Sequence, residues 1–216
     1  GQPLPENLPS QLAIIDGELT LINIDWKLFS QCYCLSSERS QILYVAASGF
    51  FSRTHDMMLW SIASAISRLL DPPGSGGRRN LVIESLLQQL NDATHQKEKS
   101  EMRLLLTEIR ELADAVIRFR NKRVAHLDSE ILEGRINIAG FTIETITQTL
   151  SGMGRILNIL HGLPPKSTYV CYDDPYIVGD GDVLASKLTD ARILKQLIDT
   201  GISIREQVKA AKESNG

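Results

Sequence analysis

The segment RNKRVAHLD, residues 120–128, contains residue types that could do chemistry. Four of its nine side chains are cationic or can become so, namely Arg120, Lys122, Arg123 and His126. An arginine is always charged, and its forked guanidinium matches the oxygens of a carboxylate or a phosphate. A histidine can take or give a proton near neutral pH. This combination is suited to binding an anion and moving protons beside it.

An amphipathic pattern leads into this segment and sets the direction of its side chains. Apolar residues recur at spacings of 4, 3, 4 and 3, at Leu105, Ile109, Leu112, Val116 and Phe119. At about 100° per residue, a helix that continues past this stripe places Arg123 on its centre line. Arg120 and His126 then lie about 60° to either side, whereas Arg118 points into solvent.

Arginines directed at a buried face need an explanation, because burying one without a partner is costly. The helix could end before Arg123, the arginines could pair with carboxylates, or the face could open onto a cleft, a partner subunit or an anion. The plainest alternative is a charged last turn that complements the helix dipole.

The composition is that of a globular protein without a general affinity for nucleic acid. Of its 216 residues, 43% are hydrophobic and 23% are charged, and the net charge is −3. An anion site must therefore be a local cluster. No apolar run approaches the roughly 18 residues of a membrane span, and the N-terminus lacks the regions of a signal peptide. The three cysteines have no metal-like spacing, and we expect them to be reduced in a cytoplasmic protein without membrane contact.

Helical periodicity dominates the chain, and no credible strand pair or repeat appears. We expect Ser36 or Ser37 to cap a second helix and Asn80 to cap a later one. The expected apolar helices include residues 19–35, 57–70, 141–162 and a long one from about Gln96, followed by a more polar helical region over 185–212 in one piece or two. In the helix over 141–162 the predicted apolar stripe comprises Ile143, Ile146, Leu150, Met153, Leu157 and Leu160. The pattern predicts an all-α bundle of five to seven helices with one long antiparallel pair. We expect a helical domain over residues 1–165, with a C-terminal loop and helical extension over 166–216 packed on it.

The motif resembles that of the HEPN superfamily, in which an Arg, usually followed by a polar residue, precedes a His by four to six residues. Here Arg120 and Asn121 precede His126 at an interval of five residues. RNKRVAHLD is similar to the abortive-infection, AbiU-type branch. WSIASAISRLLDP resembles the helix of that branch that ends in an Arg-Leu-x-Asp-Pro-like turn, before a variable loop, an Asn-Leu-opened helix and the motif helix. The resemblance covers roughly residues 12–165 and implies a HEPN-like helical bundle.

The resemblance implies cleavage of RNA without a metal or other cofactor, usually in a homodimer whose two motifs face each other across the two-fold axis. RNA carries its own nucleophile, the 2′-OH, so that His126 could transfer protons while Arg120 stabilises the charged phosphate. Asn121 could orient His126 or bind the phosphate. The implied products have a 2′,3′-cyclic phosphate and a 5′-OH. No metal-site signature is found in the sequence.

The spacing of Arg120 and His126 presents a geometric problem, because six positions correspond to about 240° on a regular helix. One chain would not readily bring both side chains to one phosphate. Either the helix is distorted there, or the Arg of one subunit meets the His of the other. Both solutions suit a composite site on a two-fold axis.

Further residues are candidates for supporting roles. Lys122 and Arg123 are candidate RNA contacts beside the motif. Arg78 and Arg79, in the Gly-rich loop DPPGSGGRRN, could contact RNA phosphates, although a solvated loop is the simpler expectation. Asp128 could orient His126 or cap the next segment.

Two other features bear on structure and partners. Arg68 and Asp71 are expected to form an i,i+3 ion pair at a helix end. The acidic, aromatic loop TYVCYDDPYIVGDGD could be a lid, a dimer contact or a contact for an antitoxin or another defence protein. The leading hypothesis is a defence or toxin ribonuclease. The alternative is a non-catalytic HEPN module that binds RNA or nucleotides, or a helical interaction module.

Overall fold

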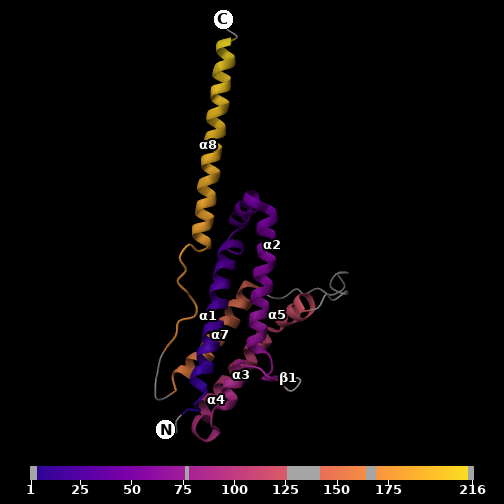
Figure 1. The fold of residues 1–216 in the computed structure, drawn as a ribbon, viewed down its shortest axis with the longest axis vertical. Helices are drawn as coiled ribbons and strands as arrows, with labels where there is room; N and C mark the ends of the chain where they lie inside the picture. Colours follow the sequence, from indigo (N-terminus) through magenta and orange to yellow (C-terminus); the bar gives the residue numbers. More distant parts are fainter. Residues whose placement is uncertain (1–3, 76–77, 126–141, 164–168, 214–216) are drawn as a thin grey trace.

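The computed structural model describes residues 4–75, 78–125, 142–163 and 169–213, and this part of the chain is a bundle of helices (Figure 1). Two long helices, α1 (Leu8–Tyr33) and α2 (Ser37–Leu70), form an antiparallel hairpin. α4 (Asp92–Leu112) packs against α7 (Ile143–His161), and α3 (Ile83–Gln89) lies near the end of the bundle where the N-terminus is found. The predicted all-α bundle is confirmed.

One cluster of buried apolar side chains joins these helices. Its members include Leu19, Ile66, Ile83, Met102 and Leu150, one from each of α1, α2, α3, α4 and α7. Burying a side chain of this size stabilises the fold by about 1.5–3 kcal/mol. The predicted apolar stripe of α7 lies within this core, except at the first turn, where Ile143 is exposed.

The helix ends follow local hydrogen bonds. Ser36 caps α2 as predicted, because its hydroxyl accepts from the Arg39 N–H. The predicted cap at Asn80 is wrong. The Asn80 amide donates instead to the carbonyl of Pro72, and α3 begins after Val82, whose N–H donates to the Ser85 hydroxyl.

The connection between α2 and α3 contains the only strands in the described part of the chain. β1 (Gly74–Ser75) pairs antiparallel with β2 (Arg78–Arg79). Two residues on each side make this a short hairpin rather than a sheet, so the helical character of the fold is unchanged.

The predicted long motif helix consists of three parts. α4 ends at Leu112, α5 (Asp114–Phe119) follows after a break at Ala113, and η1 (Arg120–Ala125) is a π-helix. The stripe is buried at four of its five predicted positions, but Leu112, immediately before the break, is 39% exposed. A constant angle per residue therefore does not hold from Leu105 to the motif, because the helix is interrupted at Ala113 and widened from Arg120.

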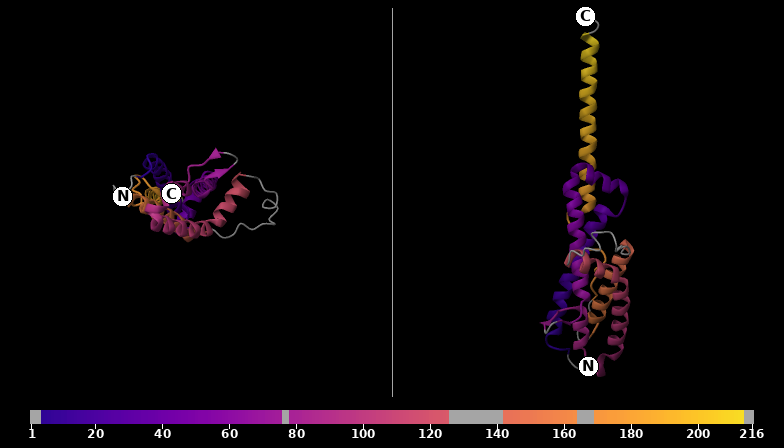
Figure 2. Two further views of the ribbon diagram at one scale, coloured as in Figure 1. Left: turned by 90° about the horizontal axis from the view of Figure 1, so that it is seen from below. Right: turned by 90° about the vertical axis from the view of Figure 1, so that its right-hand side faces the viewer.

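The C-terminal region forms one helix, α8 (Gly181–Glu213), where the sequence left two pieces open. Its first turns contact α1 and α2, and the rest extends beyond the tip of the α1–α2 hairpin (Figures 1 and 2). Within the described residues, no helix combines the length and apolarity that a membrane span requires.

Candidate functional site

Arg120, the arginine of the motif, is the first residue of the π-helical turn. Its Nη2 donates to Oδ1 of Asp71 at 2.7 Å, and its side chain is 23% exposed. Asp71 is the residue at which α2 ends. Of the arrangements open from the sequence, pairing with a carboxylate is the one found for this arginine.

One atom of this guanidinium remains without a hydrogen bond. Arg120 Nε is buried and has no acceptor within the part of the chain that the structure describes. A buried donor without a partner costs about 1–3 kcal/mol. The pairing with Asp71 therefore satisfies Arg120 only in part, and an additional acceptor would stabilise it.

A second arginine holds the same end of α2. Arg110 of α4 donates through Nε and Nη2 to the carbonyl of Leu70, at 3.2 and 3.1 Å, and through Nη2 to Glu84 at 2.7 Å. Carbonyls at a helix C-terminus lack intrahelical partners and attract cations. These contacts fix the position of Asp71, and through it that of Arg120.

The expected Arg68–Asp71 ion pair is wrong. Arg68 pairs with Glu18 of α1. Asp71 has a ψ angle of 159°, so the chain has already left the helix and the i,i+3 geometry no longer applies. Sequence reasoning therefore missed Asp71 as the partner of Arg120. The two residues are 49 positions apart, and no local pattern connects them.

The other motif residues are described only in part. Asn121 is exposed and Lys122 is half-buried. Arg123 belongs to η1, but its side chain lies outside the described residues, as do His126 and Asp128. Arg118 is exposed and pairs with Asp114, in agreement with its predicted direction.

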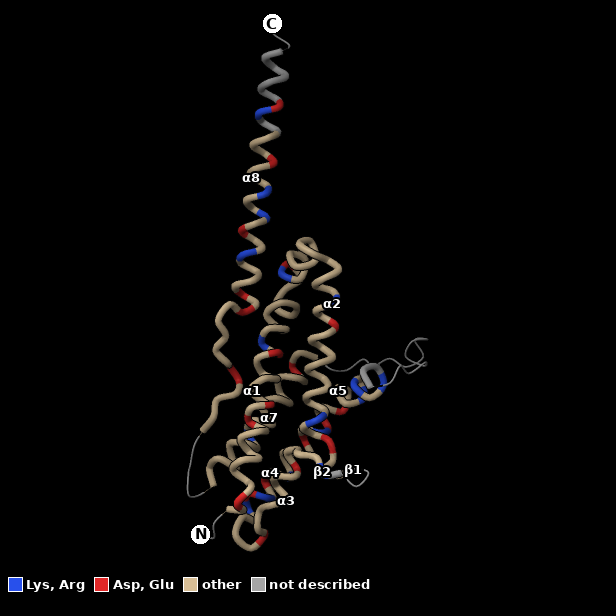
Figure 3. Tube along the Cα trace, viewed as in Figure 1, with Lys and Arg blue, Asp and Glu red and all other residues tan. Residues whose placement is uncertain are grey.

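The π-helical geometry of η1 bears on the predicted spacing problem. In a π-helix the backbone hydrogen bonds join residues five apart, so a turn holds more residues than an α-helical turn and the angle per residue is smaller. This is the local distortion that the sequence left open as one solution. Lys and Arg residues gather at this end of α5 (Figure 3).

The arginines of the Gly-rich loop lie in the β1–β2 hairpin. Arg79 lines an open cavity of about 700 Å³, together with amide side chains that include Asn7, Gln11 and Asn80. The side chain of Arg78 is outside the described residues. The described contacts do not join Arg79 to Arg120, so its predicted part in RNA binding stays a prediction.

The acidic, aromatic loop is tied to the bundle through one of its tyrosines. The hydroxyl of the buried Tyr172 donates to Asp16 of α1, and Asp16 also lies 2.8 Å from Nε2 of His161. Burial and this hydrogen bond raise the pKa of Tyr172. Tyr169 and Tyr176 are exposed. The three linked residues come from distant parts of the chain, so the sequence offered no sign of this cluster.

The described residues provide neither a metal site nor a reactive thiol. No group of three or more His, Cys, Asp or Glu side chains there could hold a metal ion. Burial raises the pKa of the thiols of Cys32 and Cys34, which disfavours the reactive thiolate form. Their role is packing.

The described residues form an all-α bundle, as the resemblance to HEPN proteins implies. A family model described as AbiU2, HEPN_AbiU2, matches residues 8–174, which is most of the chain. The chain therefore belongs to the AbiU2 family of HEPN proteins, in the abortive-infection branch. Comparisons with curated proteins and with solved structures found no match.

Proposed function

We propose that this chain is a metal-independent endoribonuclease of the phage-defence type, with Arg120, Asn121 and His126 at its active site. The observation that carries the proposal is the state of Arg120. It begins a π-helical turn, is held by Asp71 at 2.7 Å and retains a buried Nε for which the described residues offer no acceptor. Single π-helical turns are frequent at functional sites. The Arg120 side chain is still 23% exposed, so an oxygen of an RNA phosphate can approach the exposed part of this side chain.

The proposed reaction uses the 2′-OH of the RNA. His126 accepts its proton, the 2′-oxygen attacks phosphorus, and the bond to the 5′-oxygen breaks as that oxygen takes up a proton. The products are a 2′,3′-cyclic phosphate and a 5′-OH end. Arg120 binds the non-bridging oxygens and stabilises the negative charge that develops on them. Asn121, which is exposed, could reach either the phosphate or His126.

We further propose that two copies share the cleft, with the motif of one chain facing that of the other. One histidine could then remove the proton from the 2′-OH, while His126 of the partner subunit protonates the leaving oxygen. This arrangement separates the general base from the general acid, which a single histidine cannot provide in one step.

Mutations in the motif test the proposal. We expect Arg120→Ala and His126→Ala to abolish cleavage of a labelled RNA in buffer with EDTA. The matched control is Arg118→Ala, because Arg118 is a neighbouring arginine that is mostly exposed. Circular dichroism would check that each variant is folded. Full activity of His126→Ala would contradict the proposal.

The Arg120–Asp71 ion pair also favours a second candidate function. An arginine that is fixed by a carboxylate can serve as a structural contact within a non-catalytic RNA-binding or interaction module. That alternative predicts RNA binding without cleavage, or neither. Filter binding with the cleavage assay, on the same RNA, separates these outcomes.

A further inference from the structure

The far part of α8 presents an apolar face that no described residue of the chain covers. Five large side chains on this part of the helix are each at least 49% exposed: Ile193, Leu194, Leu197, Ile198 and Ile202. Four of these side chains lie on one face of the helix, because Leu197, Ile198 and Ile202 follow Leu194 by 3, 4 and 8 positions. An isolated helix gains little stability in water without an apolar face packed against a partner.

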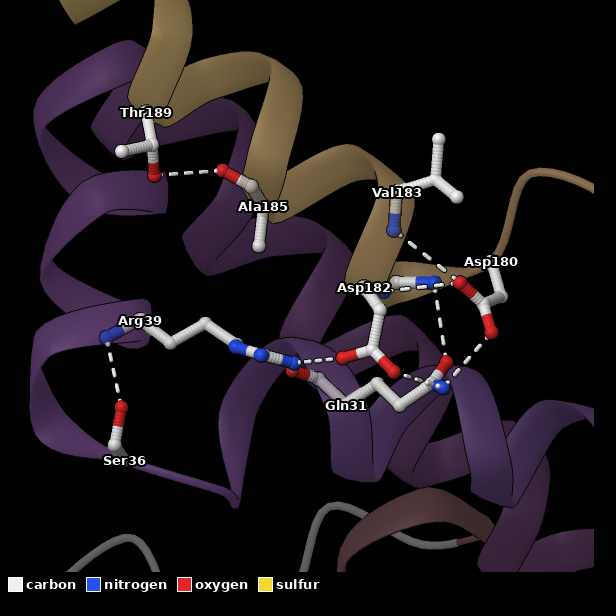
Figure 4. Close-up of polar contacts among 9 residues, drawn as sticks. Gln31, Ser36, Arg39, Asp180, Asp182, Val183, Ala185 and Thr189 are labelled. Atoms are coloured by element: carbon white, nitrogen blue, oxygen red, sulfur yellow. Dashed lines mark hydrogen bonds and ion pairs between the residues drawn. The ribbon is translucent and has the colours of Figure 1, made fainter. Parts of the chain in front are cut away.

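The beginning of α8 is firmly attached, so the helix projects in a defined direction. The Asp180 carboxylate accepts from the N–H groups of Asp182 and Val183, and the Gln31 amide donates to both Asp180 and Asp182 (Figure 4). Gly181 allows this close approach, because a Cβ there would lie 2.8 Å from Cβ of Gln31. The exposed face follows on the part of the helix beyond the bundle (Figures 1 and 2).

A glycine interrupts the exposed face. Gly201 follows Leu194 and Leu197 at spacings of 7 and 4, so it lies on the same side of the helix. A Cβ at this position would meet no atom within 4 Å, which means that the packing of the chain itself does not require a glycine. A glycine within a helix is less favourable than an alanine. This position would allow a bulky side chain of another helix to approach closely.

The charged residues of this face distinguish between partner arrangements. Asp190 lies one turn before Leu194, and Arg205 lies one turn after Gly201. Consider two copies of α8 that run antiparallel and cross at a centre between Leu197 and Ile198. Residues at equal distances from this centre then lie opposite each other, so Asp190 of one copy faces Arg205 of the other. A parallel pair in register would instead place like charges together at both positions, which is unfavourable.

We propose that α8 is an association surface for a second copy of this chain, paired antiparallel about the Leu197–Ile198 centre. Leu194 then packs over Gly201 of the partner subunit, and Asp190 faces Arg205 of the partner subunit. The match of a large side chain to a glycine and the match of opposite charges both favour this one register of the two helices. This pairing is independent of the proposed ribonuclease activity and of its dimer cleft, because α8 extends away from the helices that carry the motif (Figure 1). A chain that made both contacts would join more than two copies.

Light scattering of the full chain over a range of concentrations tests the proposal. We expect Leu197→Asp to halve the mass if α8 is the only contact between copies, and to reduce larger assemblies to the dimer of the motif cleft if both contacts are present. The control is Leu104→Asp on α4, because the two leucines are 66% and 67% exposed. We expect the control to leave the mass unchanged. An unchanged mass for Leu197→Asp, or a wild-type chain that is monomeric at every concentration, would overturn the proposal.

A charge exchange tests the register. Asp190→Arg alone places like charges opposite each other, and we expect it to weaken association by about tenfold or more. Adding Arg205→Asp in the same chain restores opposite charges, so the double variant should associate like the wild type. Failure of the double variant to recover would overturn the antiparallel arrangement. Because the readout is mass, failure of the ribonuclease proposal leaves this result unaffected.

Discussion

The bundle and the far part of α8 differ in where their apolar side chains lie. In the bundle, apolar stripes are covered by neighbouring helices, and arginines directed inward meet oxygen atoms, as Arg110 does at Leu70 and Arg120 at Asp71. On α8, leucines and isoleucines face outward. The core of the bundle is therefore covered within a single copy, whereas no described residue covers the far face of α8. The candidate active site belongs to the first region and the association surface to the second.

The largest expected difference between the regions concerns leucines. Leu150→Ala removes a side chain from the core and should lower the free energy of unfolding by about 2–5 kcal/mol. Leu197→Ala should change it by less than about 0.5 kcal/mol in dilute, monomeric protein, because the side chain is already exposed. Urea unfolding measures both. Similar losses for the two variants would mean that α8 is packed within its own chain.

Two glycines should respond with opposite signs. A Cβ at Gly152 would lie 2.7 Å from Cγ1 of Ile109, so Gly152→Ala should destabilise the fold by about 1–3 kcal/mol. Gly201→Ala meets open space and should stabilise dilute protein by up to about 1 kcal/mol. Thermal unfolding checks the signs, and light scattering should show weaker association for Gly201→Ala. Stabilisation by both substitutions would contradict the close α4–α7 contact.

The pairing of Arg120 with Asp71 should matter more than a surface ion pair. We expect Asp71→Asn to lower the free energy of unfolding by about 1 kcal/mol, because both side chains are only partly exposed and solvent weakens the interaction. Arg68→Ala, which removes a more exposed ion pair, should cost less than about 0.5 kcal/mol. If Arg120 binds the phosphate, Asp71→Asn should also slow RNA cleavage and Arg68→Ala should not. Equal effects of the two substitutions on unfolding and cleavage would argue against a positioning role for Asp71.

The smallest expected change in stability at neutral pH is that of a substitution at Tyr172, in the loop that connects the two regions. The pKa of Tyr172 is raised in the folded chain by burial and by its hydrogen bond to Asp16. Above about pH 10, the unfolded chain therefore loses the tyrosine proton more readily than the folded chain, and stability falls as the pH rises. Tyr172→Phe should reduce this loss by up to about 1.4 kcal/mol per pH unit. Urea midpoints at pH 8 and at pH 10–11 measure it, and an unchanged pH dependence would exclude the proposed cause.

The correct predictions concern residues near each other in the chain, but two other local predictions, the cap at Asn80 and the Arg68–Asp71 ion pair, were wrong. The α7 stripe and the cap at Ser36 were correct, because helix periodicity and capping depend on residues a few positions apart. The break at Ala113 was missed, since the stripe from Leu105 to Phe119 has no glycine or proline to signal it. The Asp16–His161–Tyr172 cluster was missed because its residues are far apart in the sequence and no local pattern joins them.

The sequence by itself determined the helical class, the position of the candidate motif and the resemblance to HEPN proteins. Each of these depends on residue types and short spacings, which can be read from the sequence without knowledge of the fold. Only the tertiary structure decided that Arg120 is paired with Asp71, that Arg68 is not, and that no described residue covers the far face of α8. These properties depend on which distant segments pack together, and packing selects partners through shape and burial across the whole chain.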